Sequence, residues 1–173
     1  MPAIRRRGRP ENATSPVYAR ASAGPATEIE GREMSDRGAV EMLKAARLFE
    51  GLSKKDVGEV ARRSKEIEHA AGDEIIREGA KGVGFHLILA GRARVTRNGR
   101  KLRELGPGDS FGDISLIDGG PRTASVIAET PMRLLSMMSW EFKPLLIEHP
   151  EMAYKLLLRV CGMLREAESR PPA

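Results

Sequence analysis

The sequence predicts an α+β fold that is mainly β, with helices flanking a roll of about eight short strands. Apolar residues from Val40 to Leu48 have near-helical spacing. Between residues 66 and 138 the apolar pattern shifts toward a period of two, with glycine-bearing turns between the runs. From residue 150 onward, apolar residues recur every four positions, which again favours a helix. The order of helices, strands and helices therefore predicts one β-rich domain with helical flanks.

Composition excludes several classes of protein. The chain has 173 residues, a formal net charge of +5 and only 4% aromatic residues, which fits one modest domain. Cys161 is the single cysteine, so an intramolecular disulfide framework is excluded, and three widely spaced histidines argue against a Cys/His zinc site. No apolar run approaches the roughly 18 to 20 residues that cross a bilayer, and the basic N-terminal stretch lacks the apolar core of a secretory signal. We therefore expect a cytoplasmic protein without a metal.

The first part of the chain differs in character from the rest. Residues 1–37 contain seven arginines and five acidic residues but no Leu, Phe or Trp, which is too little apolar surface to fold. We predict a disordered basic tail over 1–37, a domain over 38–169 and a short tail over 170–173. The basic tail is either a weak nucleic-acid-binding arm or, as we prefer, a solvated segment without a partner. Met34 is an alternative start that would remove most of this tail.

Local signals place the individual elements. A first helix ends before Gly51, and Ser53 followed by Asp56 is a capping-box variant that opens a second. The strands are predicted at 66–70, 74–77, 84–90, 93–97, 101–105, 122–128 and 133–138. Asn98-Gly99 predicts a type I′ hairpin turn, because both residues tolerate positive φ. Six basic residues surround this hairpin, and they form either an anion-binding patch or only its solvent-exposed face: Arg92, Arg94, Arg97, Arg100, Lys101 and Arg103.

Two helices are predicted after the last strand. Ser139 is a candidate cap for a short helix that contains Pro144, which removes one backbone donor. Pro150 is well placed to start the last helix, over 150–168. Its apolar stripe comprises Met152, Leu156, Val160 and Leu164, widened by Leu157 and Met163.

The segment from Phe111 to Val126 has the composition of an anion site. Gly112 allows close approach of the backbone to a ligand, and a short helix from Asp113 would direct free N–H groups at a phosphate. Arg122 follows a Gly-Gly-Pro turn, and its guanidinium fork suits a phosphate diester. Thr123 adds a hydroxyl, and Asp113 is an acceptor for a sugar hydroxyl.

This stretch resembles the phosphate-binding cassette of the cyclic-nucleotide-binding domain family. Further segments resemble the family in order and spacing over some 130 residues: 48–53, 71–79, 87–91 and 105–109. The resemblance implies an eight-stranded β-roll (a double-stranded β-helix or jelly roll), a cassette helix and a C-terminal helix that closes over the bound base. It also implies that Arg122 holds the cyclic phosphate and Asp113 the ribose 2′-hydroxyl. The backbone of Gly112, Ile114 and Ser115 would line the pocket, and Thr123 would contact phosphate or base.

Some features of the resemblance leave alternatives open. The family usually has Glu where this chain has Asp113, which is one methylene shorter, so weaker binding is expected. Thr123 fits cAMP or cGMP, and we favour cAMP. Arg122 would instead pair with Asp113 or Asp118 if the roll had lost its ligand. Met163 and Leu164 are candidate lid residues, or else part of the core or of a dimer seam.

The expected function is binding and not catalysis. No nucleophile with an adjacent base, acid pair or metal cluster accompanies the cassette, so we expect no enzyme. The best-known bacterial relatives of this family continue into a helix-turn-helix domain, whereas this chain has five residues after Glu168. The sequence therefore predicts a stand-alone cyclic-nucleotide sensor that acts on a protein partner through its C-terminal helix. The alternative is a structural or targeting module that acts without binding a nucleotide. Nucleic-acid binding by the basic tail and hairpin is the weakest of the three hypotheses.

Overall fold

The computed structural model describes residues 35–169, so the predicted tails lie outside it, apart from residues 35–37. Helix α1 (Asp36–Ala45) begins two residues before the predicted domain boundary at 38, with Ser35 as its N-cap. The 3₁₀ helix η1 (Arg47–Phe49) and helix α2 (Lys54–Arg63) follow. The predicted capping box is confirmed, because Ser53 Oγ accepts from the Asp56 N–H while the Asp56 carboxylate accepts from the Ser53 N–H.

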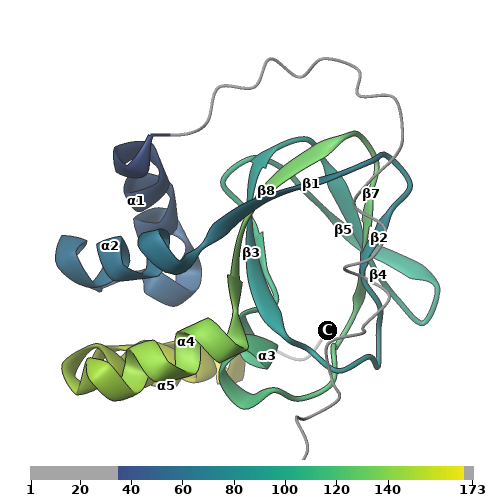
Figure 1. The fold of residues 1–173 in the computed structure, drawn as a ribbon. Helices are drawn as coiled ribbons and strands as arrows, with labels where there is room; N and C mark the ends of the chain where they lie inside the picture. Colours follow the sequence, from purple (N-terminus) through teal and green to yellow (C-terminus); the bar gives the residue numbers. More distant parts are fainter. Residues whose placement is uncertain (1–34, 170–173) are drawn as a thin grey trace, which may run out of the picture. The chain divides into compact units, whose positions relative to one another are not determined.

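Eight strands form two antiparallel four-stranded sheets that face each other across the roll (Figure 1). The strands are β1 (Lys65–His69), β2 (Glu74–Ile76), β3 (Gly84–Ala90), β4 (Ala93–Arg97), β5 (Arg100–Leu105), β6 (Ser110–Phe111), β7 (Ser125–Ala128) and β8 (Met132–Met138). One sheet has the order β1-β8-β3-β6 and the other β2-β7-β4-β5. The predicted α+β fold with a jelly roll is thereby confirmed. Strand β6 is absent from the predicted runs, since two residues are too few to show a period.

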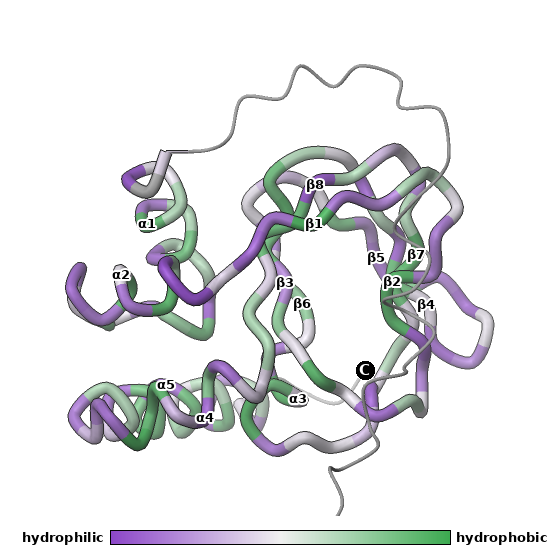
Figure 2. The backbone as a smooth tube through the Cα atoms, viewed as in Figure 1, coloured by the Kyte–Doolittle hydropathy of each residue, from purple (hydrophilic) through white to green (hydrophobic). Residues whose placement is uncertain are grey.

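The β4–β5 hairpin follows the sequence signal. Asn98 and Gly99 have φ values of 51° and 75°, and Arg97 pairs with Arg100 across them. This is the two-residue turn with positive φ at both centres that was predicted. The tip of the hairpin is hydrophilic (Figure 2).

The predicted strand over 122–128 begins only at Ser125. Arg122 instead lies in an extended segment in which its N–H donates to Ala80 O and its carbonyl accepts from Gly79 N–H, each at 2.8 Å. These bonds lie outside the regular sheet ladder, which explains the shorter strand. They hold the end of the predicted cassette against the loop before β3.

Three further helices complete the domain: α3 (Asp113–Asp118), α4 (Ser139–Glu148) and α5 (Pro150–Glu168). The predicted cap at Ser139 is wrong, because Met138 is the N-cap and Ser139 is the first helical residue. Its N–H donates to Val83 O and so continues the sheet pairing into the helix. Pro144 lies inside α4, and Pro150 starts α5 as predicted.

Helices α1, α2, α4 and α5 gather on one side of the roll, beside β3 and β8 (Figure 1). Alternation along β3 separates two cores: Phe85 and Leu87 pack with the helices, and Ile88 packs inside the roll. The Phe49 ring meets the rings of Phe85 and Phe142 edge-on, at centroid distances of 5.0 and 6.3 Å. The 3₁₀ helix is thus anchored to both the sheet and α4.

Candidate functional site

The candidate site is organised around the start of α3. Gly112 is the N-cap of this helix and has φ of 90°, a left-handed conformation that favours glycine. A Cβ atom at this position would lie 2.5 Å from Gly84 O and 2.6 Å from Arg122 Nη1. Gly112 is therefore required both for the backbone turn and for the approach of the arginine.

The Arg122 side chain extends from the C-terminal end of the cassette to the start of α3. Its side chain is buried, with 8% of the residue exposed. Nη2 donates to Gly84 O at 2.7 Å, and Nη1 donates to Gly112 O at 3.3 Å. Both acceptors are carbonyl oxygens, so the guanidinium charge is hydrogen-bonded without being neutralised.

The predicted alternative, an ion pair of Arg122 with an aspartate, is not formed in residues 35–169. Asp118 instead accepts a 2.7 Å hydrogen bond from Gly120 N–H. Burial lowers the pKa of Arg122, and the charge of Asp113 opposes that shift. A buried cation that forms no direct ion pair with a carboxylate is costly, which favours an anion as its partner.

Asp113 is the first residue of α3 and is half-buried. Burial raises the pKa of its carboxyl group, while its own backbone N–H and the charges of Arg47, Arg103 and Arg122 oppose the rise. These arginines come from η1, β5 and the segment before β7. The carboxyl group therefore lies in a positive field to which distant parts of the chain contribute.

Neither Arg47 nor Arg103 was a predicted site residue. Arg103 was named only with the basic hairpin, and Arg47 lies far from the cassette in the sequence. No local motif marks either residue, because only the fold brings them to Asp113.

The other predicted cassette residues differ in exposure. Ser115 is buried, whereas Ile114 is 62% exposed. Thr123 is exposed, and its carbonyl accepts a 2.9 Å hydrogen bond from Arg97 Nε of the basic hairpin. The fold therefore brings Gly112, Asp113, Ser115 and Arg122 together, and it leaves the Ile114 and Thr123 side chains facing solvent.

Gly82 is a further residue that the sequence did not identify. A Cβ atom there would lie 2.0 Å from Ser115 Cβ and 3.0 Å from Gly120 O. Its N–H donates to Gly120 O at 3.1 Å. The close packing of α3 on the loop before β3 thus depends on glycine at 82. Gly82 is one of three glycines between residues 79 and 84, and no local pattern distinguishes it from the other two.

A buried polar pair lies inside the roll next to Arg122. His86 Nδ1 is 2.8 Å from Ser136 Oγ, and its ring centroid is 5.1 Å from that of Phe111. Burial lowers the pKa of His86 to about 3, and the charges of Arg122 and His69 act in the same direction. His86 is therefore neutral at physiological pH.

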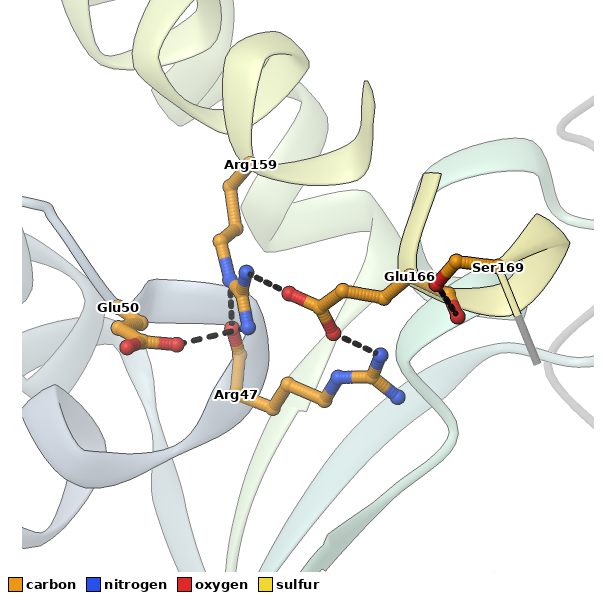
Figure 3. Close-up of polar contacts among 5 residues, drawn as sticks. All are labelled: Arg47, Glu50, Arg159, Glu166 and Ser169. Atoms are coloured by element: carbon orange, nitrogen blue, oxygen red, sulfur yellow. Dashed lines mark hydrogen bonds and ion pairs between the residues drawn. The ribbon is translucent and has the colours of Figure 1, made fainter. Parts of the chain in front are cut away.

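The predicted apolar stripe of the last helix divides in two. Met152 and Leu156 are buried, with 0% and 4% exposed, whereas Leu157, Val160 and Leu164 are exposed. Met163 is partly buried, and Leu164, the other candidate lid residue, is 59% exposed. The far end of α5 is held instead by polar contacts with η1 and Glu50 (Figure 3).

Two features are absent from residues 35–169. This part of the chain has no group of three or more His, Cys, Asp or Glu placed to hold a metal ion. It likewise has no helix of the length and apolar character needed to span a membrane.

The fold and the site define a class: an antiparallel β-roll with a buried arginine beside a glycine-led helix, suited to an anionic ligand. The family described as "Cyclic nucleotide-binding domain" matches residues 66–149, which include the whole cassette. The N-terminal domain of a transcriptional regulator from Streptomyces coelicolor is 30% identical, with a TM-score of 0.68, over 76% of this chain and 99% of that one. The chain belongs to the cyclic-nucleotide-binding domain family.

The descriptions of two other similar proteins name cAMP. A CRP-like cAMP-activated global transcriptional regulator from Mycobacterium tuberculosis is 27% identical over 134 residues, 75% of this chain and 60% of that protein. The regulatory domain of Toxoplasma gondii PKA, solved with cAMP, is 27% identical with a TM-score of 0.61, over 67% of this chain and 46% of that one. The chain thus spans about 60% of the length of the curated relative.

Proposed function

We propose that this protein is a sensor that binds a cyclic nucleotide, with cAMP as the preferred ligand, and that it is not an enzyme. The observation that carries the proposal is the buried Arg122 guanidinium, which lies at the start of α3 with carbonyl oxygens and no carboxylate as its hydrogen-bond partners. A cyclic phosphate diester would supply the missing negative charge through two exocyclic oxygens. Relatives named for cAMP support the choice of nucleotide.

Each cassette residue has a proposed role. Arg122 holds the cyclic phosphate, together with backbone N–H groups of Gly112, Ile114 and Ser115. Asp113 accepts from the ribose 2′-hydroxyl, for which its carboxylate form is required. The Thr123 side chain is exposed, so its proposed contact is with the outer part of the nucleotide.

We propose that binding is relayed through α5 to another protein. The exposed face of this helix carries Tyr154, Leu157, Cys161 and Leu164. Their spacing of three and four residues is the a/d pattern of a helix seam, so a second copy of this chain is the first candidate partner. Met163 and Leu164 remain candidate lid residues within this scheme, and the cytoplasm remains the proposed location.

Isothermal titration tests the proposal directly. The purified chain, shown by mass spectrometry to be free of co-purified nucleotide, is titrated with cAMP and then with cGMP. One-to-one saturable binding at micromolar strength or better supports the sensor and ranks the two ligands. A folded, nucleotide-free protein that gives no heat with either ligand contradicts it.

One observation favours a second candidate, a nucleotide-independent structural or targeting module. The Arg122 side chain already has two backbone acceptors without a ligand, so the cassette has a packing role of its own. In that case Arg122→Ala lowers stability but leaves the binding of a protein partner independent of added nucleotide. A nucleotide-dependent pull-down from a lysate excludes this second candidate.

A further inference from the structure

His86 lies inside the roll, between two points at which the candidate site is attached to β3. It is on the interior face of this strand, because Ile88, two residues later, packs inside the roll and alternate residues share a face. Gly84, two residues before His86, accepts the hydrogen bond from Arg122 Nη2. Phe111 pairs with His86 across β6 and directly precedes the N-cap of α3. The histidine is therefore next to both the buried arginine and the start of the cassette helix.

Only one of the two ring nitrogens of His86 has a hydrogen-bond partner among residues 35–169. Nδ1 lies 2.8 Å from Ser136 Oγ on β8, and the ring packs against the Phe111 ring of β6 at a centroid distance of 5.1 Å. Strands β8 and β6 flank β3 on its two sides, so the ring is held from both sides. Side chains stand roughly perpendicular to a sheet, which directs the more distant nitrogen, Nε2, into the roll. This part of the chain supplies no partner for Nε2.

The surroundings of His86 make an unpartnered ring nitrogen costly. His86 is 8% exposed and Ser136 is 2% exposed, and the core around them is apolar, with Ile88, Phe111 and Leu134 among its members. A buried polar atom without a hydrogen bond destabilises the fold, so buried polar atoms nearly always have a partner. The arrangement therefore favours a partner for Nε2 that enters the roll next to Arg122.

The charge state of His86 suits a neutral donor. Burial, together with the charges of Arg122 and His69, lowers the pKa of His86 to about 3, so the ring is uncharged at pH 7. A neutral imidazole donates from Nε2 only when Nδ1 accepts, which requires that the Ser136 hydroxyl donates to Nδ1. The cyclic phosphate has one negative charge, which Arg122 offsets. A neutral second donor adds a hydrogen bond to it without adding a positive charge beside the arginine.

We propose that His86 is a further ligand-binding residue, whose Nε2–H donates to an exocyclic oxygen of the cyclic phosphate held by Arg122, and that Ser136 is a positioning residue that fixes this tautomer. The inference rests on the proposed function, because it assigns a second donor to the same ligand. Both residues lie outside the cassette, on β3 and β8, and the register of the sheet brings them to it.

Two substitutions of His86 distinguish a ligand contact from a packing role. His86→Gln places an amide N–H near the position of Nε2, whereas His86→Asn places it near Nδ1, beside Ser136. Titration of each folded full chain with cAMP gives the affinities. We expect the Gln variant to bind within severalfold of the parent, and the Asn variant about tenfold to a hundredfold more weakly, as for a lost hydrogen bond to a charged group. If the Asn variant binds as well as the Gln variant or better, the buried bond to Ser136 is what matters and the ligand contact is overturned.

Nuclear magnetic resonance of the parent chain tests the tautomer without any substitution at His86. With nitrogen-15-labelled histidine, correlations to the ring protons show which nitrogen carries the proton, and His69 and His149 are internal references. We expect the proton of His86 on Nε2, and saturating cAMP to shift the Nε2 resonance more than that of Nδ1. A proton on Nδ1, with or without cAMP, overturns the proposal. We expect Ser136→Ala to give a mixture of tautomers, and a pure Nε2–H tautomer in that variant overturns the role of Ser136.

The outcomes separate this proposal from the proposed function. If the parent binds cAMP and the Gln and Asn variants of His86 bind it equally, the His86 contact is overturned and the sensor is intact. If the folded, nucleotide-free parent binds neither cAMP nor cGMP, the sensor fails and the His86 contact fails with it, whichever nitrogen carries the proton.

Discussion

Arg122 Nη2 donates a 2.7 Å hydrogen bond to the carbonyl oxygen of Gly84, the first residue of β3. The side chain proposed to hold the phosphate therefore also joins the end of the cassette to strand β3. Substitutions of Arg122 act on two properties at once, and binding and stability have to be measured side by side.

Arg122→Ala is expected to weaken cAMP binding by about thirtyfold to several thousandfold, or roughly 2 to 5 kcal/mol, because a buried charge contact is lost. The free energy of unfolding should fall by about 1 to 3 kcal/mol, since the Gly84 and Gly112 carbonyls lose their donor. Titration calorimetry and urea denaturation measure the two effects. Arg97→Ala, which removes an exposed arginine bonded to Thr123 O, is the control and should change both far less. Parent-like cAMP affinity in folded Arg122→Ala would refute the phosphate role.

Gly112→Ala should destabilise the domain and impair binding together. The new Cβ would lie 2.5 Å from Gly84 O and 2.6 Å from Arg122 Nη1, at a φ of +90°. Gly119→Ala is the matched control, since Gly119 has φ of +69° but no neighbour within 4 Å. For Gly119→Ala we expect the free energy of unfolding to fall by roughly 1 to 2 kcal/mol, which is the cost of the left-handed backbone alone. Equal losses of stability in thermal denaturation would mean that contact with Arg122 has no role.

Asp113→Glu should strengthen cAMP binding severalfold, because the added methylene extends the carboxylate toward the ribose hydroxyl, as in the glutamate usual in this family. Asp113→Asn is the control for charge and should weaken binding, since an amide oxygen accepts less strongly than a carboxylate. Competition with a fluorescent cyclic nucleotide gives both affinities. Tighter binding by Asp113→Asn than by the parent would exclude a carboxylate–ribose contact.

His86 should make the protein less stable in mild acid. Its pKa is about 3 in the folded protein against an ordinary value of 6.5, so the unfolded chain binds more protons between these values. The free energy of unfolding therefore falls as pH is lowered through this window, by at most about 1.4 kcal/mol per pH unit from this group. Urea titrations at pH 7, 6 and 5 measure the slope. The double variant His86→Phe with Ser136→Ala, which removes both members of the buried pair, should have a shallower slope; an unchanged slope would show that His86 is not its source.

Much of the fold was predictable from short-range patterns. The Ser53–Asp56 capping box, the Asn98-Gly99 turn and the start of α5 at Pro150 were all predicted correctly. Each of these features depends on interactions within a few residues, so the local sequence is sufficient to predict it. Strand β6 and the start of β7 at Ser125 were not predicted, because pairing with distant segments defines them.

The sequence by itself determined the cassette and the family it belongs to. Gly112, Asp113, Ser115 and Arg122 were identified as a group because the turn, the helix start and the arginine lie within eleven residues of one another. Only the tertiary structure decided that Arg122 hydrogen-bonds to Gly84, that Arg47 and Arg103 act on Asp113, and that α5 changes from apolar to ionic contacts. The physical reason is that hydrogen bonds and charges act through space, over about 3 Å and about 10 Å respectively, whatever the separation along the chain.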